Sequence, residues 1–320
     1  LAGHAFWYYF EEKYGAENIS YFFSLAKAYK NINKACLQIT EKKLSEVTAE
    51  FMEYQDEKYQ QDIAKRKAYP KGSLVDAFDI NPRLNYYRFN VNPLKRNNTY
   101  VVTRFKKGIM SVIYNDGDKD ITLLKYGIKS LENEMNPNYP MMAWDPKGVK
   151  IAVVYSEQSR LKLFVYHTEQ EYRQFKIDLT DTFDQIQDIK YMLDNRTLLL
   201  SAVKNGHTDI FSFDTETEKI VQITNDIYDD IDPSFVSFPN KTGILFASNR
   251  PNANAVSSDE ILPDENRYNI FMITNFGDKP ELNQITQLSN VKFGHARFPA
   301  QYNNNHFTFV SDENGIGNRY

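Results

Sequence analysis

The chain has 320 residues and a net charge of −4, and 42% of its residues are hydrophobic while 25% are charged, as in ordinary globular proteins. No basic stripe is evident, so we expect no nucleic-acid partner. No apolar run reaches the roughly 18 residues of a membrane-spanning helix. Cys36 is the single cysteine, which excludes an internal disulfide and a CxxC metal site but leaves the compartment undecided.

Apolar residues recur at helical spacing near the start of the chain. Leu44, Val47, Phe51 and Tyr54 lie three, four and three residues apart, which places them on one face of a helix. Two earlier stripes are Phe6, Trp7, Tyr9 and Phe10, and then Tyr21, Phe22, Leu25, Ala26 and Tyr29. Thr40 is expected to cap the last helix. We predict a helical domain at 1–68, followed by a linker at 69–81 that contains Pro70 and Gly72.

These helices resemble a known domain. GHAFWYYFEEKYG, followed by ITEKKLSEVTAEFMEYQDEKY, is similar to the C-terminal helices of gluzincin (MA-clan) peptidase domains. The zinc motif HExxH does not occur in the chain, and His4 with Glu11 supplies too few ligands for a zinc site. We therefore interpret His4 as a packing or capping residue, and we expect no metal and no cofactor here.

A repeat occupies the rest of the chain. Segments 143–156, 191–201, 236–248 and 300–311 each contain a strand, a polar turn, an apolar strand and a serine. The serines, Ser156, Ser201, Ser248 and Ser311, lie 45, 47 and 63 residues apart. The first two intervals match a propeller blade of roughly 40–50 residues. The third interval indicates an inserted loop, which we place at Pro251 to Glu265.

Further strands follow each serine, and a fainter unit precedes the first one, at about 100–124. One four-stranded sheet of this size cannot bury both of its faces, whereas sheets packed around an axis can. We therefore predict a mainly β fold with a β-propeller over 82–320, of which four blades and a started fifth are visible.

The segment ITNDIYDDIDPSFVSFPNKTGILFASNR resembles the blade motif of TolB-type (WD-repeat-like) propellers. That resemblance implies a ring of six blades, so we expect at least one more blade outside the chain, whose ends both look cut. The combination of this blade motif with the peptidase-like helices resembles large cell-envelope proteins of Bacteroidota-type bacteria. It implies a periplasmic or outer-membrane-associated subunit of a transport or assembly complex, with other envelope proteins as partners.

Two groups of residues are candidate sites. Asp226, Asp229, Asp230 and Asp232 could hold a cation, although such acidic stretches more often solvate and cap an inter-blade loop. The inserted loop is either functional or disordered. Its candidate partner-binding residues are Asn252, Asn254, Ser257, Asp259 and Glu260. Asp116-Gly117 lacks the Gly and Glu of a calcium loop and is predicted to be a hairpin turn.

The motifs leave three hypotheses. The chain contains no Gly-x-Ser-x-Gly elbow and no phosphate-binding glycine loop, and its histidines are scattered. We favour a non-catalytic protein-interaction scaffold. The alternative is a fragment of a peptidase whose zinc domain lies upstream or whose serine hydrolase domain lies downstream. Carbohydrate binding by aromatic rim residues is a third hypothesis that no motif selects.

Overall fold

The computed structural model describes residues 2–65, 81, 83–94, 99–129, 136, 138–255, 262–264, 267–274 and 284–320. The chain divides into two compact units, Leu1–Leu74 and Val75–Tyr320. Of the predicted linker at 69–81, only Asn81 is among the described residues.

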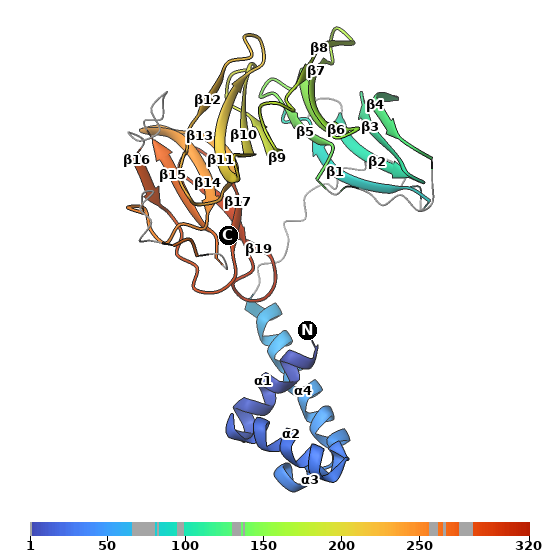
Figure 1. The fold of residues 1–320 in the computed structure, drawn as a ribbon, viewed down its shortest axis with the longest axis vertical. Coiled ribbons are helices and arrows are strands. Elements are labelled where there is room, and N and C mark those ends of the chain that lie inside the picture. Colours follow the sequence, from blue (N-terminus) through green and yellow to red (C-terminus); the bar gives the residue numbers. More distant parts are fainter. Residues whose placement is uncertain are drawn as a thin grey trace. The chain divides into compact units, whose positions relative to one another are not determined.

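The first unit is a small bundle of helices (Figure 1). Its described helices are α1 (Ala2–Tyr14), α2 (Glu17–Tyr29), α3 (Ile32–Thr40) and α4 (Leu44–Lys65). Phe10, Phe22, Val47 and Phe51 are buried in one core. The predicted stripes therefore face inward, except that Tyr21 and Tyr29 of the second stripe are exposed. None of these helices is both long and apolar enough to cross a membrane.

The start of α4 differs from the prediction. Thr40 is the last residue of α3, where its hydroxyl donates a hydrogen bond to the Cys36 carbonyl. The capping role predicted for Thr40 is therefore wrong, because a separate short helix, α3, ends at this residue. Glu41 ends α3 in the left-handed conformation, and the Lys43 amide at the start of α4 donates instead to the Glu46 carboxylate.

The second unit consists of antiparallel sheets in which the strands follow chain order. Blade 1 contains β1 (Asn85–Val91), β2 (Tyr100–Lys106), β3 (Ile109–Asn115) and β4 (Asp120–Gly127). Blade 2 contains β5 (Met141–Trp144), β6 (Lys150–Glu157), β7 (Arg160–His167) and β8 (Tyr172–Asp178). Blade 3 contains β9 (Gln185–Tyr191), β10 (Thr197–Lys204), β11 (His207–Asp214) and β12 (Ile220–Gln222).

Blade 4 contains β13 (Asp230–Phe238), β14 (Lys241–Ser248), β15 (Asn269–Thr274) and β16 (Gln284–Gln287). The fifth sheet is three-stranded within the described residues and contains β17 (Ala296–Gln301), β18 (Phe307–Ser311) and β19 (Asn318–Arg319). The four repeat serines lie in β6, β10, β14 and β18, the second strand of each sheet, as the spacing predicted.

The first strands of the sheets lie next to one another. Contacts join β1 to β5, β5 to β9, β9 to β13 and β13 to β17, and each of these strands is an edge of its own sheet. The sheets therefore pack as successive blades around an axis (Figure 1). Within the described residues this gives four blades and a partial fifth, which confirms the predicted mainly β propeller.

Apolar side chains fill the space between neighbouring blades. Val101 of β2 shares a core with Val153 of β6, and Leu163 of β7 shares another with Leu200 of β10. Leu199 of β10 packs in the same cluster as Phe246 of β14. Adjacent residues of β10 thus serve two different interfaces, as the alternation of side chains along a strand requires.

Candidate functional site

Three of the first strands carry the same irregularity. The register shifts between Tyr87 and Asn90 in β1, between Ile231 and Ser234 in β13, and between Arg297 and Ala300 in β17. In each case the bulge begins with a residue of positive φ, and these residues are Arg88 (48°), Asp232 (55°) and Phe298 (54°). Pro233 and Pro299 follow two of them, in an edge position where no ladder N–H is needed.

Side chains, rather than ladder hydrogen bonds, link the first strands to one another. Asn90 of β1 donates to the Met142 carbonyl of β5 at 3.0 Å, and the Trp144 indole donates back to the Asn90 carbonyl at 3.1 Å. The Tyr139 hydroxyl donates to the Ile186 carbonyl and accepts from its amide, both at 3.0 Å. These contacts fix blades 1, 2 and 3 against each other at the axis.

The first strands β13 and β17 are linked in a similar way. Gln301 of β17 accepts a hydrogen bond from the Ser237 amide and donates one to its carbonyl, both at 2.9 Å. The Arg297 guanidinium pairs with both carboxylate oxygens of Asp232, the bulge residue of β13. A bulge residue therefore places a charge beside the neighbouring first strand.

A hollow of about 420 Å³ lies between β1, β5 and β9, and we call it the axial hollow. Its lining includes Arg88, Asn90, Met142, Trp144, Asp188 and Lys190. The hollow thus combines an aromatic ring and a thioether with charges of both signs. Among the described residues that line it there is no serine, cysteine or histidine.

Charged groups of the axial hollow act on one another. Desolvation by the surrounding protein raises the pKa of Asp188, and the charge of Asp232 raises it further. Lys190, whose Nζ lies 4.0 Å from the Asp188 carboxylate, opposes both effects. Partial desolvation lowers the pKa of Arg88, while the charge of Asp188 raises it. The hydroxyl of Tyr191, which also lines the hollow, is buried with no hydrogen-bond partner among the described residues. Tyr191 therefore contributes its ring to the lining of the hollow, while its hydroxyl is a buried donor.

The predicted acidic stretch is divided among separate partners. The Asp229 carboxylate accepts hydrogen bonds from the Asn249 side chain at 3.5 Å and from the Tyr268 hydroxyl at 3.4 Å, and Asp232 pairs with Arg297. Asp226 and Asp230 both face Arg250. The structure therefore does not bring the four predicted aspartates together around one point.

Arg250 is the centre of a buried network. Its guanidinium lies 2.8 and 3.0 Å from the carboxylate oxygens of Asp230, 2.9 Å from Asp226 and 3.0 Å from the Ser248 hydroxyl. The side chain is fully buried, and one guanidinium nitrogen, Nη1, has no partner among the described residues. Sequence reasoning missed the role of Arg250, although this residue is the last of the Ser-Asn-Arg sequence that ends the blade motif.

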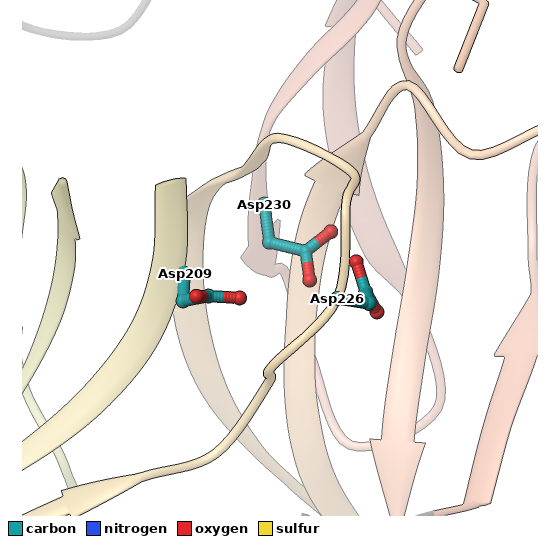
Figure 2. A group of neighbouring side chains, drawn as sticks. All are labelled: Asp209, Asp226 and Asp230. Atoms are coloured by element: carbon teal, nitrogen blue, oxygen red, sulfur yellow. The ribbon is translucent and has the colours of Figure 1, made fainter. Parts of the chain in front are cut away.

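A third carboxylate, from Asp209 of β11, joins Asp226 and Asp230, as Figure 2 shows. One ligand atom from each lies within 4.8 Å of the other two. Burial, and then the charges of Asp230 and Asp226, raise the pKa of Asp209 to about 7. Since Arg250 already supplies the counter-charge for two of the three, the arrangement is that of a buried ion-pair network that ties the loop after β12 to blades 3 and 4.

The inserted loop is described in part. Asn252 and Asn254 are exposed, and the Asn252 side chain accepts a hydrogen bond from the Asn254 amide at 2.9 Å. Ser257, Asp259 and Glu260 lie outside the described residues. The partner-binding role predicted for these five residues stays a prediction.

No family model matches the sequence, and no curated protein matches it. Solved structures do match at low identity. TolB from Acinetobacter baumannii is 16% identical over 74% of this chain and 51% of its own, with a TM-score of 0.38. The β-propeller domain of the Trilobed protease from Pyrococcus furiosus is 13% identical over 69% and 76%, with a TM-score of 0.38. A nidogen/laminin complex gives 12% over 74% and 76%, with a TM-score of 0.46.

The chain spans about half the length of the Acinetobacter TolB. Its membership of the β-propeller class follows from its own described sheets and from the contacts between their first strands.

Proposed function

We propose that this chain is a non-catalytic protein-interaction scaffold of the bacterial cell envelope, and that its axial hollow receives part of a partner protein. The blade motif from Ile223 to Arg250 and the peptidase-like wording of the first helices support the envelope assignment through their resemblance to TolB-type and gluzincin domains. A role in a transport or assembly complex is part of the same proposal.

The composition of the axial hollow is the observation that carries the proposal. Trp, Tyr, Met and Arg are the residue types enriched at protein interfaces, and Trp144, Tyr191, Met142 and Arg88 all line this one hollow. Asp188 and Lys190 add charges that can select a partner of complementary charge.

Site-specific photo-cross-linking in living cells tests the proposal. A photoreactive residue replaces Lys190 in the complete natural protein, and a control carries it at Lys241, an exposed residue that does not line the hollow. We expect discrete cross-linked envelope proteins from position 190 and none from position 241. The charge reversal Asp188→Arg should remove them, because it places a third cation beside Arg88 and Lys190.

Equal cross-linking from both positions, or cross-links that survive Asp188→Arg, would overturn the use of the hollow. Peptide hydrolysis by the purified complete protein provides the test of the peptidase alternative. Activity that a chelator or a serine-reactive inhibitor removes would favour that alternative over a non-catalytic scaffold.

A further inference from the structure

One face of blade 1 carries a row of polar side chains across neighbouring strands. Arg104 of β2 is paired in register with Ser111 of β3, and Ser111 is paired with Lys125 of β4. Residues directly opposite each other point to the same face of a sheet. Arg104 and Lys125 therefore flank the Ser111 hydroxyl, with their backbones two strand spacings, roughly 10 Å, apart.

Three more cations complete a pocket of about 330 Å³ at this place, which we call the basic pocket. Its cations are Arg104, Lys106, Lys107, Lys125 and Lys129. No carboxylate lines it among the described residues, and no ion pair of these five side chains is found there. Five positive charges thus share one hollow in a protein whose net charge is −4.

The backbone holds the walls of the basic pocket in place. The turn between β2 and β3 passes through Lys107 and Gly108, both with positive φ. Gly127 at the end of β4 also has positive φ, and a Cβ there would lie 2.3 Å from the Gly108 carbonyl oxygen. This close approach keeps the turn that carries Lys106 and Lys107 beside the end of β4. Lys125 and Lys129 lie within two residues of Gly127, on either side of it in the sequence.

Such crowding of like charges costs stability in the free protein, since like charges on neighbouring strands repel. A bound anion with several charges would relieve that repulsion. From the five cations, the Ser111 hydroxyl and the closed backbone, we infer that the basic pocket binds a compact phosphate group of at least two negative charges, either a phosphomonoester or a pyrophosphate.

The direction of the donors favours phosphate over a carboxylate. Arg104 and Lys106 of β2 and Lys125 of β4 share one sheet face and lie on either side of Ser111, while Lys107 and Lys129 follow the ends of these strands, so cations approach the Ser111 hydroxyl from both neighbouring strands. A tetrahedral phosphate accepts hydrogen bonds in several directions, whereas a planar carboxylate accepts in one plane. A guanidinium binds phosphate through two parallel bonds, and ammonium groups add charge.

Binding can be measured by calorimetric titration of pyrophosphate into the protein, at constant ionic strength, with citrate as a carboxylate comparator. Vesicles containing phosphatidic acid present the same phosphate chemistry on a lipid, with phosphatidylcholine vesicles as their control. We expect pyrophosphate to bind more tightly than citrate. Additional binding to phosphatidic acid vesicles would identify a lipid headgroup as the source of the phosphate, and its absence would identify a soluble one.

The double variant Arg104→Gln/Lys125→Gln should weaken pyrophosphate binding by about tenfold or more, because two charge-assisted contacts are lost. Lys34→Gln/Lys241→Gln removes the same charge at exposed positions outside the pocket and should bind like the parent. Thermal unfolding gives a second readout. Without anion the pocket variant should be at least as stable as the parent, and with pyrophosphate it should gain less stability than the parent.

Three results would overturn the inference. Pyrophosphate and phosphatidic acid could both fail to bind. Pyrophosphate could bind the pocket variant and the parent equally. Citrate, or a single-stranded oligonucleotide, could bind more tightly than pyrophosphate through the same cations, which would assign the pocket to another class of ligand.

Discussion

At the scale of single residues, Arg250 holds a buried ion-pair network in blade 4. Its buried guanidinium is held by two carboxylates and one hydroxyl, and it lies 5.3 to 5.6 Å from the ring centres of Tyr228, Phe246 and Phe271. A buried ion pair of this kind is costly to break, because the remaining charges cannot be hydrated.

We therefore expect Arg250→Met to lower the free energy of unfolding by about 3–5 kcal/mol, since it leaves two aspartates buried without a counter-charge. Denaturant titration would measure the loss. The triple variant Arg250→Met/Asp226→Asn/Asp230→Asn should recover much of it. Equal stability of the single variant and the parent would contradict the role given to this network.

Asp209 makes stability depend on pH. Its pKa is about 7 in the folded protein, above the ordinary value of 3.8. Above pH 7 the carboxylate is ionised in both states and its burial opposes folding. As the pH falls from 7 towards 4, the folded state binds a proton that the unfolded state does not, so this group's contribution to stability rises.

Asp209→Asn should consequently stabilise the protein at pH 8, by roughly 2–4 kcal/mol, and the gain should fade towards pH 4. Urea unfolding of the variant and the parent across this range would show the difference. Asp181→Asn, at an exposed position, is the matched control. A gain independent of pH would mean that Asp209 is not the titrating group.

At the scale of elements, blades 2, 3 and 4 share one recurring hydrogen bond. A hydroxyl after the fourth strand accepts a hydrogen bond from an amide near the start of the third strand. The pairs are Leu161 with Thr180 at 2.9 Å, Ile210 with Thr224 at 2.9 Å and Ile270 with Ser289 at 2.7 Å. The repeated threonine or serine thus ends the outer strand of a blade while satisfying a backbone donor of its neighbour.

A substitution of the buried Thr224 tests the importance of this hydrogen bond. Thr224→Val keeps the shape of the side chain but leaves the Ile210 amide without an acceptor, which should cost about 1–3 kcal/mol of stability. Thr242→Val, at an exposed position of β14, should change stability by less than about 0.5 kcal/mol. Chemical denaturation of both variants provides the comparison, and similar losses would argue against the hydrogen bond as the cause.

Much of the propeller was accessible from the sequence because each blade repeats one apolar pattern. The serine spacing placed the second strands, and Asp116-Gly117 indicated the turn that joins β3 to β4. The sites were less accessible. Asp226 and Asp230 were identified as acidic, but their counter-ion Arg250 lies a full hairpin away, and the basic pocket is assembled from residues 104 to 129. Such groupings depend on register, and register is a property of the folded sheet.

At the scale of the whole molecule, the two compact units have separate cores. Phe10 belongs to the cluster of the helical unit, and all other members of that cluster lie between Ala5 and Tyr54. The cores of the blades contain residues of the second unit alone. Thermal unfolding of the chain should therefore show two transitions rather than one.

Phe10→Ala should lower the free energy of unfolding of the helical unit by about 3–5 kcal/mol, and with it the temperature of that unit's transition, because it creates a cavity at a fully buried ring. Scanning calorimetry should show the propeller transition unmoved. Leu200→Ala, a cavity in blade 3, provides the reciprocal variant and should move the propeller transition alone. A joint shift of both transitions in either variant would indicate that the units unfold together.

The bulges of β1, β13 and β17 also restrict how a partner can bind. An edge strand with a regular backbone invites a foreign strand to add to its sheet, and a bulge interrupts the donors and acceptors that such an addition requires. Two of these edges also contain a proline, which removes one more donor. Of these three strands, β1 lines the axial hollow, so a protein that enters the hollow meets an interrupted edge on that side, and its side chains rather than an added strand should decide whether it binds there.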